Sequence, residues 1–409
     1  ASVGDFGWSG HVAGVVYASI LPGVLMAGLP FELTVFDKAY VNQGPLGAPM
    51  SLSGEVVHNG VGSLEFTLPS DHPRIPALTA SGARVLANYT PPGKAAQFLI
   101  SGAVEQVDGG GSSRAPWRKF ALVDDWSVLT DEVQCWPNPT GTIAQQGDDE
   151  AYFTVTGPAE TVLKSILAPN VTRQGTVLTI PATAGLGATI TGKVRFHTVF
   201  ERLFPAITQA GLGVRVRQSG TTRILEVYVP TVHTRVLTQE SGIVVSGEYS
   251  VSRPTITRVT ALAGGEGTAR VVRQKIDAAL ESAWGVCLPA ARDARDVAAD
   301  DPNLEALLLA RMDETLAEGA PKASLKCELV ESESFQYGVA FGLGDTLPIR
   351  LAGGPVITDA VQSVPFSWTP GGEGVKVTPR VGDWSDVADT QIVNHVTALT
   401  RAVSNLEKV

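Results

Sequence analysis

Between residues 31 and 128, short runs rich in Val, Thr, Leu and Phe alternate with turn residues, and no stretch has helical spacing. Such closely spaced runs are typical of β-strands that follow one another without intervening helices. The clearest hairpin covers 51–69, where His58, Asn59 and Gly60 supply a turn that tolerates positive φ. The pattern predicts a small antiparallel barrel or sandwich, with strands at 31–37, 51–69, 83–89, 98–107 and 117–126 and a turn at 109–113.

A different rhythm follows a polar, proline-broken stretch at 131–150, where we place a domain boundary. Residues 157–170 predict a helix that starts at Pro158. Residues 193–212 predict an amphipathic helix, because their apolar residues recur at three- and four-residue steps. A hairpin at 214–229 completes an α+β module at 151–230, which we interpret as an insertion after the first barrel at 31–130.

Strands resume at about 231–262, which we expect to complete the first barrel. The range 263–382 predicts a second β-barrel with one helix at 301–319, where Asp300 and Asp301 stand at the N-cap position. The expected fold class is therefore mainly β with an α+β insertion: two antiparallel β-barrel domains, the inserted module and a C-terminal helix.

The two ends of the sequence differ from the rest. Residues 1–30 form an N-terminal extension whose apolar run at 12–30 is broken by Pro22 and three glycines, which favours two short strands over a stable membrane insertion. Residues 383–409 predict a helix with an apolar seam that steps by 4, 3, 4 and 3. The seam fits either an oligomer contact or a helix docked on its own domain, and its members are Ile392, Val396, Leu399, Val403 and Leu406.

Charge and cysteine content limit the possible partners. The net charge is −10 and no basic stripe is present, so specific binding to nucleic acid is not expected. An acidic surface suits a conduit through which DNA slides, although it equally suits ordinary solubility. The three cysteines, Cys135, Cys287 and Cys327, are far apart and match no metal spacing, which indicates reduced thiols and assembly in a cytosol.

No catalytic motif stands out. The six histidines form no HExxH or paired arrangement, and no GxSxG elbow is present. Gly264, Gly265 and Gly267 read as a turn rather than a phosphate loop, because the GKS or GKT ending is missing. Acidic pairs such as Asp124–Asp125, and the run 148–150, could serve a glycosidase. We predict no catalytic residue, no cofactor and no metal.

Taken in order, several segments resemble the minor tail proteins, or baseplate hubs, of long-tailed phages that infect actinobacteria. The resemblance covers about residues 31–385. The segments that carry it are LPSDHP (68–73), LVDDWSVL (122–129), Pro137-Asn138-Pro139, GPAETVLKSILAPN (157–170), AGLGVRV (210–216), AGGEGTAR (263–270), ARDARDV (291–297) and FGLGDTLPIRL (341–351).

The resemblance implies a structural protein of the virion, assembled in the host cytoplasm and placed at the tail tip. Such proteins form a homotrimer that closes the tail tube, in which two barrels per chain let three subunits face a sixfold ring. The implied partners are the distal tail protein, the tail tube, the tape measure protein and a central fibre or other tip proteins, and DNA passes without specific binding. Two alternatives stay open: a wall hydrolase using Asp124 and Asp125, and a receptor- or glycan-binding protein using Trp117, Trp126 and Trp136.

Overall fold

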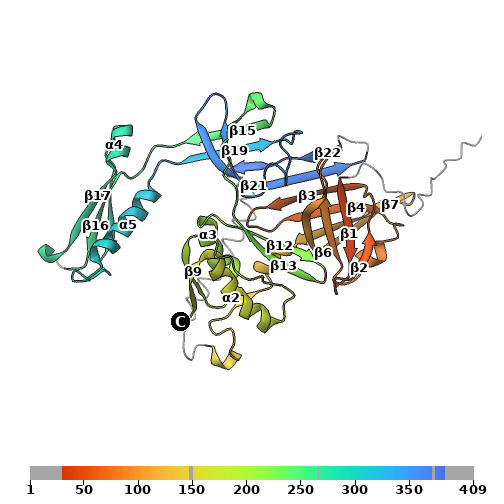
Figure 1. Cartoon of the computed structure of the whole chain (residues 1–409), viewed down its shortest axis with the longest axis horizontal. Helices are drawn as coiled ribbons and strands as arrows, with labels where there is room; N and C mark the ends of the chain where they lie inside the picture. The colour runs from red at the N-terminus through yellow and green to blue at the C-terminus, as the bar shows by residue number, and fades with distance from the viewer. Residues whose placement is uncertain (1–29, 147–150, 266, 371–373, 383–409) are drawn as a thin grey trace, which may run out of the picture.

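The computed structural model describes residues 30–146, 151–265, 267–370 and 374–382 (Figure 1). Within these residues most of the regular structure is β, which confirms the predicted mainly β fold class. One large sheet of fourteen strands dominates, and smaller antiparallel and mixed sheets accompany it.

Two parts of the chain build the large sheet, and each contributes seven strands. The first strand group consists of β1 (Phe31–Phe36), β2 (Asn42–Pro45), β3 (Ser51–Val57), β4 (Ser63–Pro69), β5 (Arg84–Tyr89), β6 (Gln97–Ser112) and β7 (Ala115–Asp124). The second strand group consists of β14 (Leu237–Thr238), β15 (Val244–Val251), β19 (Ala323–Leu329), β20 (Thr346–Arg350), β21 (Val356–Thr369), β22 (Gly374–Val377) and β23 (Arg380–Gly382).

The long strand β21 joins the two strand groups. Its first residues pair with β20, and further along it pairs with β23, β22 and, in the first strand group, β3. The main path of the sheet therefore runs β15-β19-β23-β21-β3-β4-β7-β6-β5-β1-β2. Among the described residues neither group closes into a separate barrel, because β3 pairs with β4 on one side and with β21 of the second strand group on the other.

A single apolar core lies beneath both strand groups. Alternate residues of the strands point into it, as the period of a pleated strand requires. Phe66 and Phe120 stack at 5.3 Å between ring centroids inside the first group. Phe31 contacts Tyr89 at 5.3 Å and Phe366 of the second group at 5.5 Å, so aromatic packing crosses the junction.

One predicted turn is wrong. The glycine run at 109–111 lies inside β6, which continues to Ser112 and pairs with β7 from Gly102 to Ser112. The chain reverses at residues 113–114 instead. Pairing with β7 overrides the weak strand preference of glycine here, and the result is a long exposed two-stranded arm.

The inserted module occupies the chain between the two strand groups and has its own core. Its elements are β8 (Gln134–Cys135), β9 (Phe153–Pro158), α2 (Ala159–Gln174), β10 (Thr189–Val194), β11 (His197–Thr198), α3 (Val199–Gln209), β12 (Gly213–Ser219) and β13 (Thr222–Tyr228). The short helical segment η1 (Asp125–Leu129) contributes to this core, and η2 (Ile143–Gln145) lies between β8 and β9 in the sequence. Helix α1 (Ile75–Leu78) packs instead on the first strand group, next to β1. Helix α2 begins after Pro158, as predicted.

The second helix of this module starts later than predicted. Residues 193–198 belong to β10, a tight bend and β11, and Phe196 in the bend has a φ of +54°. Thr198 then caps α3 in a capping box with Glu201. The Thr198 side chain accepts a hydrogen bond from the Glu201 backbone N–H and so fixes where the helix begins, and the spacing of apolar residues alone does not show this position.

A separate unit, the limb, projects from the strands β15 and β19 (Figure 1). It consists of residues 255–320 and carries a small core of its own. Its elements are β16 (Arg258–Ala263), η4 (Gly267–Ala269), β17 (Val272–Ile276), α4 (Ala278–Trp284), β18 (Pro289–Ala294) and α5 (Leu304–Glu318). The sequence predicted α5 but neither the three-stranded sheet nor α4.

The predicted cap of α5 is also wrong. The N-cap residue is Asn303, and its side chain makes no capping hydrogen bond. Asp301 Oδ1 accepts a hydrogen bond from the Asn303 backbone N–H at 2.7 Å, so this carboxylate stabilises the preceding turn. The sequence is compatible with a helix capped by Asp300 or Asp301 or with one that begins later, and the turn at 301–303 places the N-cap at Asn303.

Several predictions fall outside the described residues. These are the strands expected within 1–30, the acidic run 148–150, and the C-terminal helix with Ile392, Val396, Leu399, Val403 and Leu406. In the described part of the chain, no helix combines the length and hydropathy needed to cross a membrane. Cys135 and Cys327 are buried and Cys287 is exposed, and all three are free thiols.

Candidate functional site

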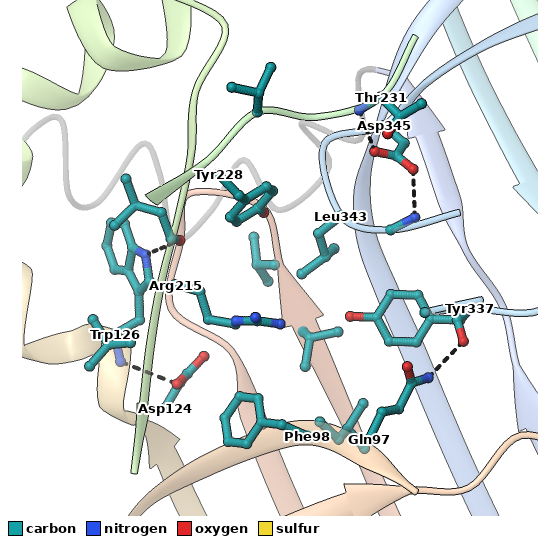
Figure 2. A pocket seen from close by; sticks show the side chains of 18 residues that line it. Gln97, Phe98, Asp124, Trp126, Arg215, Tyr228, Thr231, Tyr337, Leu343 and Asp345 are labelled. Atoms are coloured by element: carbon teal, nitrogen blue, oxygen red, sulfur yellow. Dashed lines mark hydrogen bonds between the residues drawn. The ribbon is translucent and has the colours of Figure 1, made fainter. Parts of the chain in front are cut away.

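A pocket of about 300 Å³ lies where three parts of the chain meet (Figure 2). The first strand group supplies Gln97 and Phe98 from β6 and Asp124 from the end of β7. The hairpin β12–β13 of the inserted module supplies Arg215 and Tyr228. The loop 337–345 of the second strand group forms the remaining wall.

Asp124 is the most perturbed acid of this pocket. Its half-buried side chain accepts a hydrogen bond from the Trp126 backbone N–H at 3.2 Å and so caps η1. Burial raises the pKa of Asp124 to about 7, although backbone hydrogen bonds from Trp126, Gly62 and Asp125 act in the opposite direction. Asp124 is therefore partly protonated near neutral pH.

Arg215 points into the centre of the pocket (Figure 2). Its Nε and Nη2 atoms donate to Glu226 Oε2 at 3.0 and 2.7 Å, and Arg217 Nε donates to Glu226 Oε1 at 2.5 Å. These arginines hold the pKa of Glu226 below its usual range, against the opposing effect of burial. The guanidinium of Arg215 also lies 5.8 Å from the Phe98 ring centre.

Asp345 fixes the third wall of the pocket. Its side chain accepts backbone hydrogen bonds from Thr231 at 2.7 Å and from Gly342 at 2.8 Å, and it lies 3.1 Å from His233 Nε2. On the same side, Gln97 Nε2 donates to the Tyr337 carbonyl at 2.7 Å. These contacts tie the loop 337–345 to β6 and to the segment that follows β13.

Tyr228 links this wall to the hairpin β3–β4. The Tyr228 hydroxyl lies 3.3 Å from His58 Nδ1. Burial raises the pKa of Tyr228 to about 12 and lowers the pKa of His58 to about 4, so both groups stay neutral at pH 7. Asn59, in the predicted turn, donates to the Leu212 carbonyl at 2.9 Å and accepts from the Val214 backbone N–H at 2.8 Å.

Next to the pocket lies an ion cluster in which Arg84, Asp125 and Arg223 are buried and Glu132 is exposed. Asp125 is paired with Arg84, and it accepts a hydrogen bond from Ser101 Oγ at 2.6 Å. Arg223 Nη1 is 4.0 Å from Asp125 and forms a bidentate pair with Glu132 at 2.5 and 2.7 Å. Because Arg84 lies on β5 and Arg223 on β13, the cluster joins the first strand group to the inserted module.

Gln218 extends this junction. Its backbone N–H donates to Ser101 Oγ at 2.9 Å, and its side-chain oxygen accepts from Arg84 Nε at 3.1 Å. Asp125 was identified from the sequence as a candidate acid, whereas Arg84, Gln218 and Arg223 were not. Their long sequence separations leave no local signal, except that Arg84 stands at the start of an otherwise apolar strand.

The geometry of Asp124 and Asp125 does not suit paired acid catalysis. Asp125 is almost fully buried, at 2% exposure, and is neutralised by arginine. Asp124 and Asp345 both line the pocket, and the Asp345 carboxylate is engaged by backbone hydrogen bonds from Thr231 and Gly342. Within the described residues, no three His, Cys, Asp or Glu side chains gather where they could hold a metal ion.

The three tryptophans considered for glycan binding are largely engaged in packing. Trp126 is 2% exposed, donates Nε1–H to the Val214 carbonyl at 3.0 Å, and packs edge-on against Phe204. Trp136 is half-buried under the Arg173 guanidinium, 3.7 Å from its ring centre. Trp117 is half-buried on β7, beside Gly110.

The raised pKa of Asp124 leads to a testable pH dependence. Its pKa is above the unfolded value, so the stability it contributes is complete below pH 4 and is lost as the pH rises towards and through about 7. Because the pocket is open to solvent, which screens the charge, we count roughly half of the free energy that three pKa units represent. We therefore expect the pH-dependent loss of unfolding free energy to be about 2 kcal/mol smaller in Asp124→Asn. Urea unfolding of both proteins at pH 5 and pH 8 measures it, and equal pH dependence in both would contradict it.

Comparisons with known proteins give a family match for this chain. The sequence matches the family described as Siphovirus ReqiPepy6 Gp37-like protein over residues 32–383. No curated protein sequence matches the chain.

Solved structures of tail proteins are similar in outline. A tail protein from Neisseria meningitidis MC58 is 12% identical with a TM-score of 0.48, over 87% of this chain and 97% of that one. The 43 kDa tail protein of prophage MuSo2 from Shewanella oneidensis is 11% identical with a TM-score of 0.48, over 86% and 98%. Prophage tail protein gp18 from Listeria monocytogenes EGD-e is 11% identical with a TM-score of 0.49, over 90% and 99%.

The family match covers most of the chain, including both strand groups, the inserted module and the limb. The chain therefore belongs to the family described as Siphovirus ReqiPepy6 Gp37-like protein, which confirms the resemblance to proteins of long-tailed phages drawn from its sequence.

Proposed function

We propose that this protein is the structural hub of the tail tip: a homotrimeric ring that closes the tail tube and connects it to the central fibre or other tip proteins. The observation that carries the proposal is the equal division of the large sheet, in which two parts of one chain supply seven strands each over a shared core. Three such chains present six strand groups, so a threefold ring can face a sixfold one.

The edges of the sheet support assembly with further copies. At one end, β2 has four residues, ends in Pro45, and has its Pro45 carbonyl occupied by Arg74 Nε at 3.2 Å. A short, proline-ended and covered strand is protected against pairing with another chain. This end of the sheet is therefore closed to partners.

The other end of the main sheet path is open. Strand β15 has eight residues, carries neither Lys nor Pro, and pairs with β19 alone among the described residues. Residues 245–251 are exposed, including Val245 at 59% and Val251 at 49%. A bulge near Val244 leaves the remainder regular. A long unprotected edge is a template for pairing with another chain, and we propose that the next subunit of the ring occupies it.

The contacts around the pocket, where the inserted module meets the two strand groups, fit a structural role. Both the ion cluster and the hydrogen bonds of Asp345 hold the inserted module against the two strand groups. These ion pairs and hydrogen bonds keep the parts of a subunit in fixed relative positions, which a ring of subunits requires. Partners on this proposal are the distal tail protein, the tube and the tape measure protein above, with fibre proteins below. DNA passes through without specific binding.

The mass of the purified protein tests the proposal. We expect sedimentation to give three times 42.9 kDa, about 129 kDa, at micromolar concentration. Incubation with host wall material is the companion experiment, and we expect no release of sugar or peptide. A monomer that persists at high concentration would contradict the trimer. Wall cleavage that is lost in Asp124→Asn would favour the alternative of a wall hydrolase.

A further inference from the structure

One hydroxyl group of the pocket has no partner within the described residues. Tyr337 is 9% exposed, and its backbone is held on both sides. Its N–H donates to Glu331 Oε1 at 2.6 Å, and its carbonyl accepts from Gln97 Nε2 at 2.7 Å. Its hydroxyl forms no hydrogen bond with any described residue, and it points into the pocket (Figure 2).

A buried hydroxyl without a partner is unfavourable for folding. Removing such a group from water costs free energy unless another hydrogen bond replaces the lost one, and native proteins contain few exceptions. Burial also raises the pKa of Tyr337, so its hydroxyl keeps its proton at neutral pH and is able to donate. The hydroxyl of Tyr337 is therefore suited to a ligand in the pocket.

Arg215 supplies a second free donor on the opposite side. Glu226 occupies its Nε and Nη2 atoms, and Nη1 has no partner among the described residues. The guanidinium and the Tyr337 hydroxyl point towards each other across the middle of the pocket (Figure 2). Because Arg215 comes from β12 and Tyr337 from the loop 337–345, the two donors meet only in the folded chain.

Acceptors and an aromatic ring complete the lining. The carboxyl group of Asp124 faces the pocket from the end of β7, and Phe98 lies below Arg215 (Figure 2). Gln97 Oε1 accepts no hydrogen bond from the described residues. An alanine at Gly338 would place its Cβ 1.9 Å from this oxygen, so the glycine lets Gln97 lie against the loop.

The charges around the pocket favour a neutral ligand. A cation would meet the guanidinium of Arg215, whereas an anion would meet the carboxylates of Asp124 and Asp345. A neutral molecule with several hydroxyl groups avoids both conflicts, because each hydroxyl accepts from a donor and donates to an acceptor. The cavity, at about 300 Å³, is at the small end of ligand pockets, which range over about 300–1,000 Å³.

We propose that this pocket binds one ring of a neutral saccharide. Arg215 and Tyr337 donate to its hydroxyl oxygens, and Asp124 accepts from one of its hydroxyl groups. The C–H face of the ring lies on Phe98, which is the kind of aromatic wall that ligand pockets use. The site lies within one subunit, so it adds a ligand to the proposed hub without depending on the trimer.

Saturation-transfer NMR tests the proposal on the full chain. The probes are glucose, galactose and mannose at millimolar concentration, each beside its uronic acid. At least one neutral sugar is expected to receive saturation from the protein. Its uronic acid is expected to receive less, because the added carboxylate approaches Asp124 and Asp345. No transfer to any neutral sugar would overturn the proposal, and equal or stronger transfer to the uronic acids would overturn the neutral class.

Tyr337→Phe locates the binding in this pocket. Its loss of one donor is expected to weaken sugar binding at least about fivefold in a titration. The melting temperature is expected to stay the same or to rise slightly, because the hydroxyl has no partner among the described residues. The matched control is Tyr152→Phe, since that hydroxyl lies outside the pocket. Equal affinity in Tyr337→Phe and the unchanged protein would overturn the assignment of the site.

Arg215→Met provides a second test on the opposite side of the pocket. It removes the free Nη1 donor, while Arg217 stays paired with Glu226 at 2.5 Å. Binding is expected to weaken at least about fivefold. Arg118→Met, which changes an exposed arginine on β7 away from the pocket, is expected to leave the affinity unaltered. Equal effects of Arg215→Met and Arg118→Met would contradict the proposal.

Discussion

Replacing Asp125 by alanine is expected to lower the free energy of unfolding by about 3–5 kcal/mol. Asp125 is 2% exposed and is paired with Arg84, which is itself 7% exposed. Removing the carboxylate leaves a buried guanidinium without its counter-charge, and it also leaves Ser101 without an acceptor. The cost comes chiefly from this uncompensated charge. Urea unfolding at pH 7, followed by tryptophan fluorescence, measures it.

Asp131 provides the matched control. It is a nearby aspartate with an exposed side chain, and Asp131→Asn is expected to change stability by less than about 0.5 kcal/mol. A loss of under 1 kcal/mol on Asp125→Ala would show that the ion cluster does not hold the inserted module in place.

Lysine substitutions on β15 are expected to dissociate the proposed trimer. Val245→Lys together with Val251→Lys adds two charges to an edge that pairs with β19 alone among the described residues. Charged edge strands disfavour pairing with another chain, so we expect the trimer dissociation constant to rise at least about tenfold, or about 1.4 kcal/mol. Sedimentation across a dilution series measures the shift.

The control for this experiment is Val232→Lys, which alters a side chain that is 70% exposed and lies outside the open edge. Because all three valines are exposed in the single subunit, none of these changes is expected to alter its stability by more than about 0.5 kcal/mol. If the β15 variant and the control sediment alike as trimers, β15 is not the subunit contact.

Local patterns were sufficient to predict most strands and helices. Strand β1 and the hairpins β3–β4 and β12–β13 appear where alternation and turn residues placed them, and Asn59 has the positive φ expected of its turn. The predictions are wrong where a long-range contact or a side-chain hydrogen bond determines which element forms or where it begins. The glycine run at 109–111 is a strand because β7 pairs with it, and α3 starts at Thr198 because of its capping box.

The site was harder to predict than the elements. Asp124 and Asp125 were identified as an acidic pair, yet their roles differ because Arg84 and Arg223, 41 and 98 residues from Asp125 in the sequence, approach one of them and not the other. The periodicity of apolar residues in the sequence does not predict which buried charged residues will form ion pairs. The limb illustrates the same limit: Arg273 and Lys275 of β17 pair with Glu305 and Asp313 of α5, and no local pattern predicts pairs between residues this far apart in the sequence.

The central claim is that three copies of this chain form a ring at the end of the tail. A cryo-electron microscopy reconstruction of the tail tip of an intact particle that carries this protein tests it most directly. We expect density for three copies around the tail axis, with the first and second strand groups alternating around the tube opening to give six groups, and with β15 against the next subunit. Six copies per ring, or density for this chain along the tail shaft and not at its tip, would contradict it.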